Sequence, residues 1–193
     1  MNQCPGLGLT DKNILMSGLS LNLGSGRDWR EDCVNADIKD SVRCDWMMDV
    51  CDIKWGRHFK CRFGFICIRP GIFEKIVAND VLEHVSDLVK CMTNCKELLT
   101  EDGEMHIRVP YDLSYGAWQD PTHVRAFNEK SWLYYCEWSS YIGWKDRFDL
   151  VSMDYCLSDL GQSLELPQEE LVRTPRAVDA LQLVLKKRKG PPK

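Results

Sequence analysis

The feature that most constrains the fold is a short apolar segment, Leu19–Leu23, that runs directly into the turn Gly24-Ser25-Gly26. Two glycines one residue apart let the backbone adopt positive φ angles and approach a ligand closely, because glycine has no side chain. We expect a strand that ends in a ligand-binding turn. We also expect the polar segment Arg27–Asp32 to open a helix whose free N–H groups face the same point. A Gly-x-Gly pair alone is a weak signal, since glycines end many strands that bind nothing.

Three further segments combine a short apolar stretch with a carboxylate near its end. They are Cys33–Ile38 with Asp37, Cys44–Val50 with Asp49, and Phe73–Asp80. In an open α/β sheet the ligand lies beyond the carboxyl ends of the strands. We therefore expect the acid after the second strand to accept both hydroxyls of a ribose. The acid after the third strand is expected to accept from the amine of an adenine.

Four motifs in this order resemble those of small class I S-adenosylmethionine-dependent methyltransferases of the type 11-like group. They read Leu-Asn-Leu-Gly-Ser-Gly, Val-Asn-Ala-Asp, Cys-Asp-Trp-Met-Met-Asp and Ala-Asn-Asp-Val-Leu-Glu-His-Val. The resemblance covers about Leu19 to Trp132. Two features depart from it. Asn22 stands where many relatives have an acid, and the long segment Arg57–Gly71 has no obvious counterpart.

The resemblance implies an α/β fold, with a doubly wound, seven-stranded, mainly parallel sheet and an antiparallel hairpin at its C-terminal edge. The remaining sequence pattern agrees with this. Apolar residues recur at helical spacing over Val81–Leu99, Glu104–Pro110 alternates as a strand, and Asn128 is suited to cap a helix that ends near Glu137. The predicted hairpin strands are Arg147–Tyr155 and Val178–Leu185, joined by a polar loop, Ser158–Pro175.

The length and the charge of the chain fit a single globular domain. We expect a single domain over residues 1–193, with its core at about 17–188. The chain has 25 basic and 29 acidic residues and a net charge of −4, which argues against a large nucleic-acid surface. The basic run Lys186–Lys189 is interpreted as the solvated end of the last strand.

The sequence shows no sign of a membrane or secretory segment. No apolar run is long enough to span a bilayer, and the N-terminus lacks a charged region followed by an apolar one. The ten cysteines are scattered without a Cys-x-x-Cys pair or a Cys/His cluster of zinc-finger spacing. We therefore expect a cytoplasmic protein with reduced thiols, no metal and no membrane partner.

The resemblance also implies that the chain binds S-adenosyl-L-methionine and releases S-adenosyl-L-homocysteine. The residues expected to bind this cofactor lie at or beside the four strand ends: Leu23, Gly24, Ser25, Gly26, Asp37, Ile38, Asp49, Val50, Asp80, Val81 and His84. Such a cofactor carries a reactive sulfonium, so the protein supplies mainly alignment and desolvation.

Methyl acceptors of this fold usually meet the cofactor after the fifth strand. In this chain Tyr111–Phe127 alternates aromatic and polar residues, a composition that suits a pocket wall. The candidate acceptor-binding residues are Tyr111, Tyr115, Trp118 and Arg125. His123 is the candidate base, Asp120 is expected to orient it, and Asp80 is expected to contact the sulfonium side or the acceptor. The alternative is that His123 and Asp120 only hold the loop together.

The predicted reaction moves a methyl group to an oxygen or nitrogen of a small acceptor, and analogy favours a sugar or glycan hydroxyl. A nucleobase or nucleotide acceptor is the alternative within the class, since Tyr115, Trp118 and Arg125 are suited to stacking. A non-catalytic methyltransferase-like binding module is the rival class. A nicotinamide-dependent oxidoreductase is disfavoured, because Trp29 stands where the last glycine of Gly-x-Gly-x-x-Gly would be.

Overall fold

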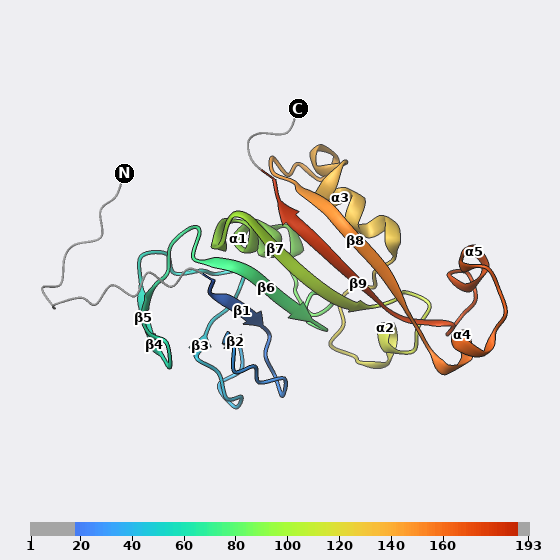
Figure 1. The fold of residues 1–193 in the computed structure, drawn as a ribbon, viewed down its shortest axis with the longest axis horizontal. Coiled ribbons are helices and arrows are strands. Elements are labelled where there is room, and N and C mark those ends of the chain that lie inside the picture. The colour runs from blue at the N-terminus through green and yellow to red at the C-terminus, as the bar shows by residue number, and fades with distance from the viewer. Residues whose placement is uncertain (1–17, 189–193) are drawn as a thin grey trace, which may run out of the picture.

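The computed structural model describes residues 18–188, which form a seven-stranded sheet in the order β3-β2-β1-β6-β7-β9-β8 (Figure 1). Its strands are β1 (Ser20–Leu23), β2 (Cys33–Asp37), β3 (Trp46–Met47), β6 (Phe73–Asn79), β7 (Leu99–Pro110), β8 (Phe148–Leu157) and β9 (Val178–Lys187). The first five strands pair in parallel, whereas β9 runs antiparallel to both β7 and β8. This doubly wound strand order confirms the predicted α/β sheet and its antiparallel edge hairpin.

The central strands are buried, as their apolar sequences predict. Leu21 on β1, Val34 on β2 and Ile76 on β6 have no exposed surface. On β7 the apolar side chains alternate with polar ones, so that Met105 is buried while its neighbour His106 is half-buried. The alternation of side chains along each strand therefore directs one set toward the helices and the other set away from them.

The helices are few and short. The longest is α1 (Leu88–Leu98), which begins after the N-cap Asp87. It starts later than the predicted helix over Val81–Leu99, because residues 81–86 form turns. The other helices are α2 (Gly116–Gln119), η1 (Glu129–Trp132), α3 (Leu133–Cys136), η2 (Ser139–Ile142), α4 (Asp159–Ser163) and α5 (Gln168–Leu171). As predicted, Asn128 caps η1. Within residues 18–188 no helix is long and apolar enough to cross a membrane.

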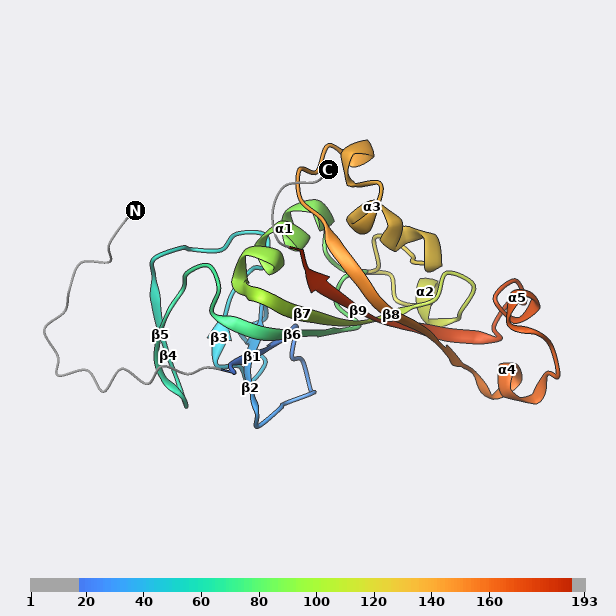
Figure 2. The same cartoon turned by 45° about the horizontal axis from the view of Figure 1, so that its top comes forward.

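Helices α1 and α3 lie on the same side of the sheet (Figure 2). The connections 24–32 and 38–45 contain turns and bends, so the helix expected from Arg27–Asp32 is wrong. A helical crossover between parallel strands usually takes a dozen or more residues, and the first connection is shorter than that. The face turned away from α1 is polar, and a hollow of about 310 Å³ lies over it. Its lining includes Lys75, Asn79, His106, Arg108 and Gln182.

The segment Arg57–Gly71 forms a hairpin of its own, made of β4 (His58–Cys61) and β5 (Gly64–Cys67). The ring of Phe59 stacks on Trp46 of the edge strand β3 at 4.9 Å. Arg62 pairs with Asp45 at 3.3 Å and also donates to the carbonyl of Cys33. The hairpin thus anchors the short edge strand of the sheet, where unpaired backbone groups would otherwise be open.

Candidate functional site

The Gly-x-Gly turn lies directly beside the end of β6. Gly24 and Gly26 have φ angles of +62° and +48°, a region that side chains disfavour. A Cβ atom on Gly24 would lie 2.4 Å from Cγ2 of Val81. The structure therefore brings together residues that the sequence analysis assigned to one cofactor site although they are far apart in the chain.

The carboxylate of Asp37 holds this turn against the end of β2. Its Oδ2 accepts from the backbone N of Gly26 at 2.8 Å, and its Oδ1 accepts from the backbone N of Lys39 at 2.9 Å. Asp37 is buried, and the next side chain, Ile38, is 63% exposed. A carboxylate has about four acceptor positions, so two remain for a ligand. The position and the remaining acceptor capacity of Asp37 fit its expected role toward a ribose.

Two further features bear on whether these residues fit an adenosyl cofactor. The hydroxyl of Ser25, within the turn, is buried and has no hydrogen-bond partner. An unpartnered buried hydroxyl is unusual and fits a site completed by a ligand. At the end of β3, Asp49 is exposed and accepts from the backbone N of Cys51 at 2.7 Å, while Val50 is buried. The donor and acceptor set at the strand ends therefore fits the expected group.

Asp80, expected to contact the sulfonium side or the acceptor, also has a partner within the protein. Its backbone is left-handed, with a φ angle of +53°. Nη1 of Arg108 donates to both of its carboxylate oxygens at 2.5 Å. Arg108 lies on the polar face of β7, so Asp80 forms an ion pair across the ends of β6 and β7. Sequence reasoning missed Arg108, although its place as a lone cation near the end of a strand was a usable signal.

A compact group of ionisable side chains lies where the segment after β6 meets the loop after α2. Glu83 is 1% exposed, and neither of its carboxylate oxygens has a hydrogen-bond partner. Burial raises the pKa of Glu83 to about 7. Nε2 of His123 lies 4.0 Å from Oε1 of Glu83, and the rings of His84 and His123 meet edge to face at 4.5 Å. Sequence reasoning predicted no role for Glu83 as the partner of His123.

A hydrogen bond fixes which nitrogen of the His123 ring carries a proton. Nδ1 of His123 lies 2.9 Å from the carbonyl of Ala117, which can only accept, so this nitrogen donates. In the neutral ring Nε2 then has a lone pair that faces Glu83.

Asp120 does not make the contact expected of it. Its Oδ1 accepts from the backbone N and the hydroxyl of Thr122, which lowers the pKa of Asp120, and that hydroxyl lies 2.9 Å from Nδ1 of His84.

Arg125 braces the segment that carries Glu83. Its guanidinium donates to the carbonyls of Leu82, Val85 and Ser86, the last at 2.9 Å. The backbone N of Val124 adds a bond to the carbonyl of Glu83 at 2.9 Å. These contacts hold two distant loops together, so Arg125 has a structural role besides the acceptor role expected of it.

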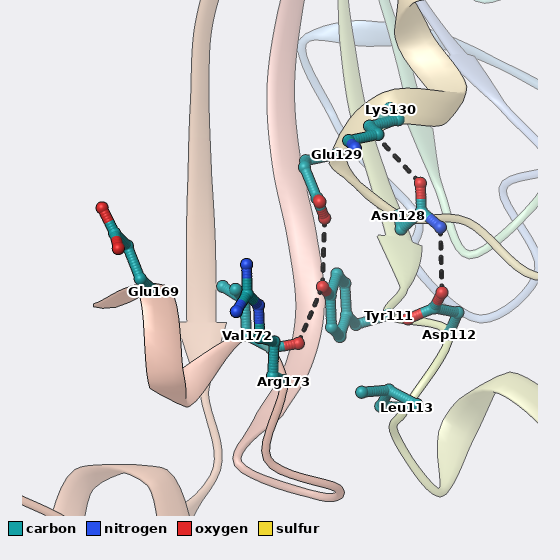
Figure 3. Close-up of a pocket in the computed structure, with 9 residues that line it drawn as sticks. All are labelled: Tyr111, Asp112, Leu113, Asn128, Glu129, Lys130, Glu169, Val172 and Arg173. Atoms are coloured by element: carbon teal, nitrogen blue, oxygen red, sulfur yellow. Dashed lines mark hydrogen bonds between the residues drawn. The ribbon is translucent and has the colours of Figure 1, made fainter. Parts of the chain in front are cut away.

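The aromatic residues of the acceptor loop fall into two groups. Tyr111 is buried, and its hydroxyl lies 3.0 Å from both Oε2 of Glu129 and the carbonyl of Val172. It lines a cavity of about 490 Å³, where Figure 3 shows this hydroxyl directed at those two partners. By contrast, Tyr115 and Trp118 are 60% and 65% exposed. Only these two aromatic side chains of the predicted acceptor set present open surface.

Comparison with solved structures identifies the fold of the chain. No family model matches the chain, and no curated protein matches its sequence. Among solved structures it is similar to a SAM-dependent methyltransferase from Archaeoglobus fulgidus, with a TM-score of 0.60 and 14% identity over 88% of this chain and 86% of that one. It is also similar to the N-methyltransferase NodS from Bradyrhizobium japonicum in complex with S-adenosyl-L-homocysteine, with a TM-score of 0.52 and 13% identity over 88% and 77%.

A third similar structure is a putative S-adenosylmethionine-dependent methyltransferase from Listeria monocytogenes, with a TM-score of 0.55 and 12% identity over 89% of this chain and 90% of that one. Coverage is high in all three comparisons, whereas identity is low. The chain therefore has the class I methyltransferase fold, and the chemistry of its site has to be argued from its own residues.

Proposed function

We propose that the chain transfers a methyl group from S-adenosyl-L-methionine to an oxygen or nitrogen of a small acceptor. The observation that carries this proposal is the Gly24–Gly26 turn, held by Asp37 and pressed against Val81 at the carboxyl ends of β1, β2 and β6. In an open α/β sheet this is where ligands bind. The three methyltransferase structures described above share the fold and support the cofactor class.

In this proposal each strand end holds one part of the cofactor. Gly24 and Gly26 let the backbone approach the adenosyl group, and Asp37 accepts from the ribose hydroxyls. Asp49 accepts from the adenine amine, with Ile38 and Val50 as apolar walls. Bound there, the cofactor supplies a methyl group on a positively charged sulfur, which needs alignment with the acceptor and little other assistance.

His123 is the group best placed to take the acceptor's proton. Its Nδ1 bond to Ala117 leaves the Nε2 lone pair available. Glu83, 4.0 Å from that nitrogen, is suited to stabilise the imidazolium that would form. The carbonyl of Ala117, which accepts from Nδ1, has the orienting role first assigned to Asp120. Asp120 would act indirectly, because its carboxylate accepts from the hydroxyl of Thr122, which in turn contacts Nδ1 of His84.

The acceptor is proposed as a small molecule or glycan, with a sugar hydroxyl preferred by analogy. Tyr115 and Trp118 offer exposed rings that suit the flat face of a sugar or a base. The guanidinium of Arg176 already lies 3.8 Å over Tyr115, so Trp118 is the more accessible of the two. The net charge of −4 favours a small acceptor over a nucleic acid. We place the protein in the cytoplasm without a membrane partner, in keeping with its free thiols at Cys91, Cys95 and Cys136.

One observation favours a second candidate, a non-catalytic module that binds the cofactor. The connection 24–32 has no helix, so the turn lacks the row of free N–H groups that a helix N-terminus would offer. Such a module would bind the cofactor and transfer nothing.

A labelling experiment separates the two candidates. The full chain is incubated with methyl-labelled S-adenosyl-L-methionine and a small-molecule extract, with the Asp37→Ala variant as the matched control. Methyl transfer predicts labelled small molecules that the variant does not produce. Cofactor binding without labelling of any fraction would favour the binding module, and absence of both would refute the proposal.

A further inference from the structure

The group formed by Glu83, His84 and His123 has the composition of a metal site. Each residue offers one ligand atom, and these three atoms all lie within 4.8 Å of one another. Two imidazoles and one carboxylate form a common ligand set for divalent transition metals, in which further coordination positions stay open. Spacing along the sequence does not reveal the group, because the loop that carries His123 folds back onto the segment after β6.

Both imidazoles are oriented as metal-ligating histidines usually are. His123 donates its Nδ1 proton to the carbonyl of Ala117, which leaves the lone pair on Nε2. For His84 the orientation follows from a chain of bonds. The hydroxyl of Thr122 gives its proton to Asp120 at 2.7 Å, so it accepts from Nδ1 of His84 at 2.9 Å. The neutral His84 ring then also carries its lone pair on Nε2.

The environment of the Glu83 carboxylate independently supports a metal site. Its side chain is 2% exposed, and its two oxygens have no hydrogen-bond partner. A buried carboxylate without partners is costly, and buried charges in proteins are usually paired or coordinate metals. Nε2 of His123 lies 4.0 Å from Oε1 of Glu83, beyond hydrogen-bond distance. A cation between these two groups would satisfy both.

We propose that Glu83, His84 and His123 bind one divalent transition-metal ion of the zinc type through the Glu83 carboxylate and Nε2 of both histidines. Ligand atoms around such an ion lie about 2.0–2.2 Å from it, so the three side chains must close in by roughly 1 Å when it binds. Three protein ligands leave a position open for an acceptor hydroxyl, and in that respect the inference rests on the proposed function. Metal binding itself does not depend on it. With the ion bound, the lone pair on Nε2 of His123 is occupied, so the ion, and not the free imidazole, would promote loss of the acceptor's proton.

The test is a titration of the chelator-treated full chain with Co²⁺, followed by absorption, and with Zn²⁺ in competition. Cobalt reports its ligands, because thiolates give an intense charge-transfer band that nitrogen and oxygen ligands do not. This matters in a chain with ten cysteines. The expected result is one ion per chain without the thiolate band, displaced by Zn²⁺.

Variants locate the ion. Glu83→Gln, His84→Asn and His123→Asn should each weaken binding about 100-fold or more, because each removes a ligand. Thr122→Val, at an exposed position, should weaken it about 10- to 100-fold by releasing His84. The matched control is His106→Asn, since His106 also faces a glutamate, Glu104 at 3.1 Å, but lies on the polar face of β7. Its affinity should equal that of the wild type.

Absence of cobalt binding, or binding that the four variants leave unchanged, would overturn the inference. If Glu83→Gln fails to fold, the exposed Thr122→Val variant still decides it. Calorimetry with S-adenosyl-L-homocysteine on the same samples keeps the two proposals apart. Cofactor binding without metal binding removes only the metal site, and metal binding without cofactor binding removes only the proposed function.

Discussion

Replacing Asp37 by alanine should weaken cofactor binding strongly while the domain stays folded. The wild-type carboxylate accepts from the backbone of Gly26 and Lys39 at 2.8 and 2.9 Å and keeps two acceptor positions for the ribose. Each charge-assisted bond to the ribose contributes about 1.5–3 kcal/mol, so the loss of both is at least about 3 kcal/mol. That corresponds to a rise of more than about 100-fold in the dissociation constant.

The cost to stability should be smaller. Gly26 and Lys39 are exposed, so water can replace the lost carboxylate at both N–H groups. We expect the free energy of unfolding to fall by about 1–3 kcal/mol, which a domain of ordinary stability tolerates. Calorimetry gives the dissociation constant for S-adenosyl-L-homocysteine, and circular dichroism gives the unfolding transition.

The matched control is Asp40→Ala, which removes an exposed carboxylate three residues further along. It should change neither the dissociation constant nor the free energy of unfolding. The comparison thereby separates the effect of removing one negative charge from the effect of removing the hydrogen bonds of Asp37. If Asp37→Ala stays within a factor of two of the wild-type dissociation constant, the ribose role of Asp37 is wrong.

Three further predictions concern the glycine turn, the acceptor loop and a cysteine that follows β3. Gly24→Val places a Cβ 2.4 Å from Val81 at a φ angle of +62°, so cofactor binding should be lost in calorimetry; Gly56→Val, at +78° with nothing within 4 Å, has the same backbone strain alone and should bind normally. His123→Ala should lower turnover about 10²- to 10⁴-fold in a methyl-transfer assay and leave the cofactor dissociation constant unchanged. Burial raises the pKa of Cys51 to about 11, so at pH 8 mass spectrometry should find it alkylated about 100-fold more slowly than an ordinary thiol, with the rate rising as the pH approaches 11.

Each of these has an outcome that contradicts it. Equal losses of binding in Gly24→Val and Gly56→Val would attribute the effect to strain and not to the approach of Val81. Turnover of His123→Ala within threefold of the wild type would reduce His123 to a residue that holds its loop. Alkylation of Cys51 at the rate of a small-molecule thiol would mean that its side chain is open to solvent.

The strands and the cofactor turn were predictable because their signals are local. Buried strands such as β1 and β6 are apolar runs that end in glycine or an acid, and the sequence analysis located both to within a residue. The N-cap at Asn128 was recognised for the same reason, since its side chain bonds a backbone N–H two residues away.

Features that depend on distant residues were not predictable. The helix expected from Val81 starts only at Leu88, because Arg125 binds three carbonyls of residues 82–86 and holds them in turns. Likewise, nothing near Glu83 in the sequence indicates that His123 will face it. The loop expected over Ser158–Pro175 contains two short helices, and the first of them is capped by Ser158, a local signal that was overlooked.

The central claim is that the turn at Gly24–Gly26 binds an adenosyl cofactor. The most direct measurement is a calorimetric titration of the full chain with S-adenosyl-L-methionine and with S-adenosyl-L-homocysteine. The proposed function predicts one site per chain with a dissociation constant in the low micromolar range, roughly −8 kcal/mol. Absence of binding of either compound up to millimolar concentrations would contradict it.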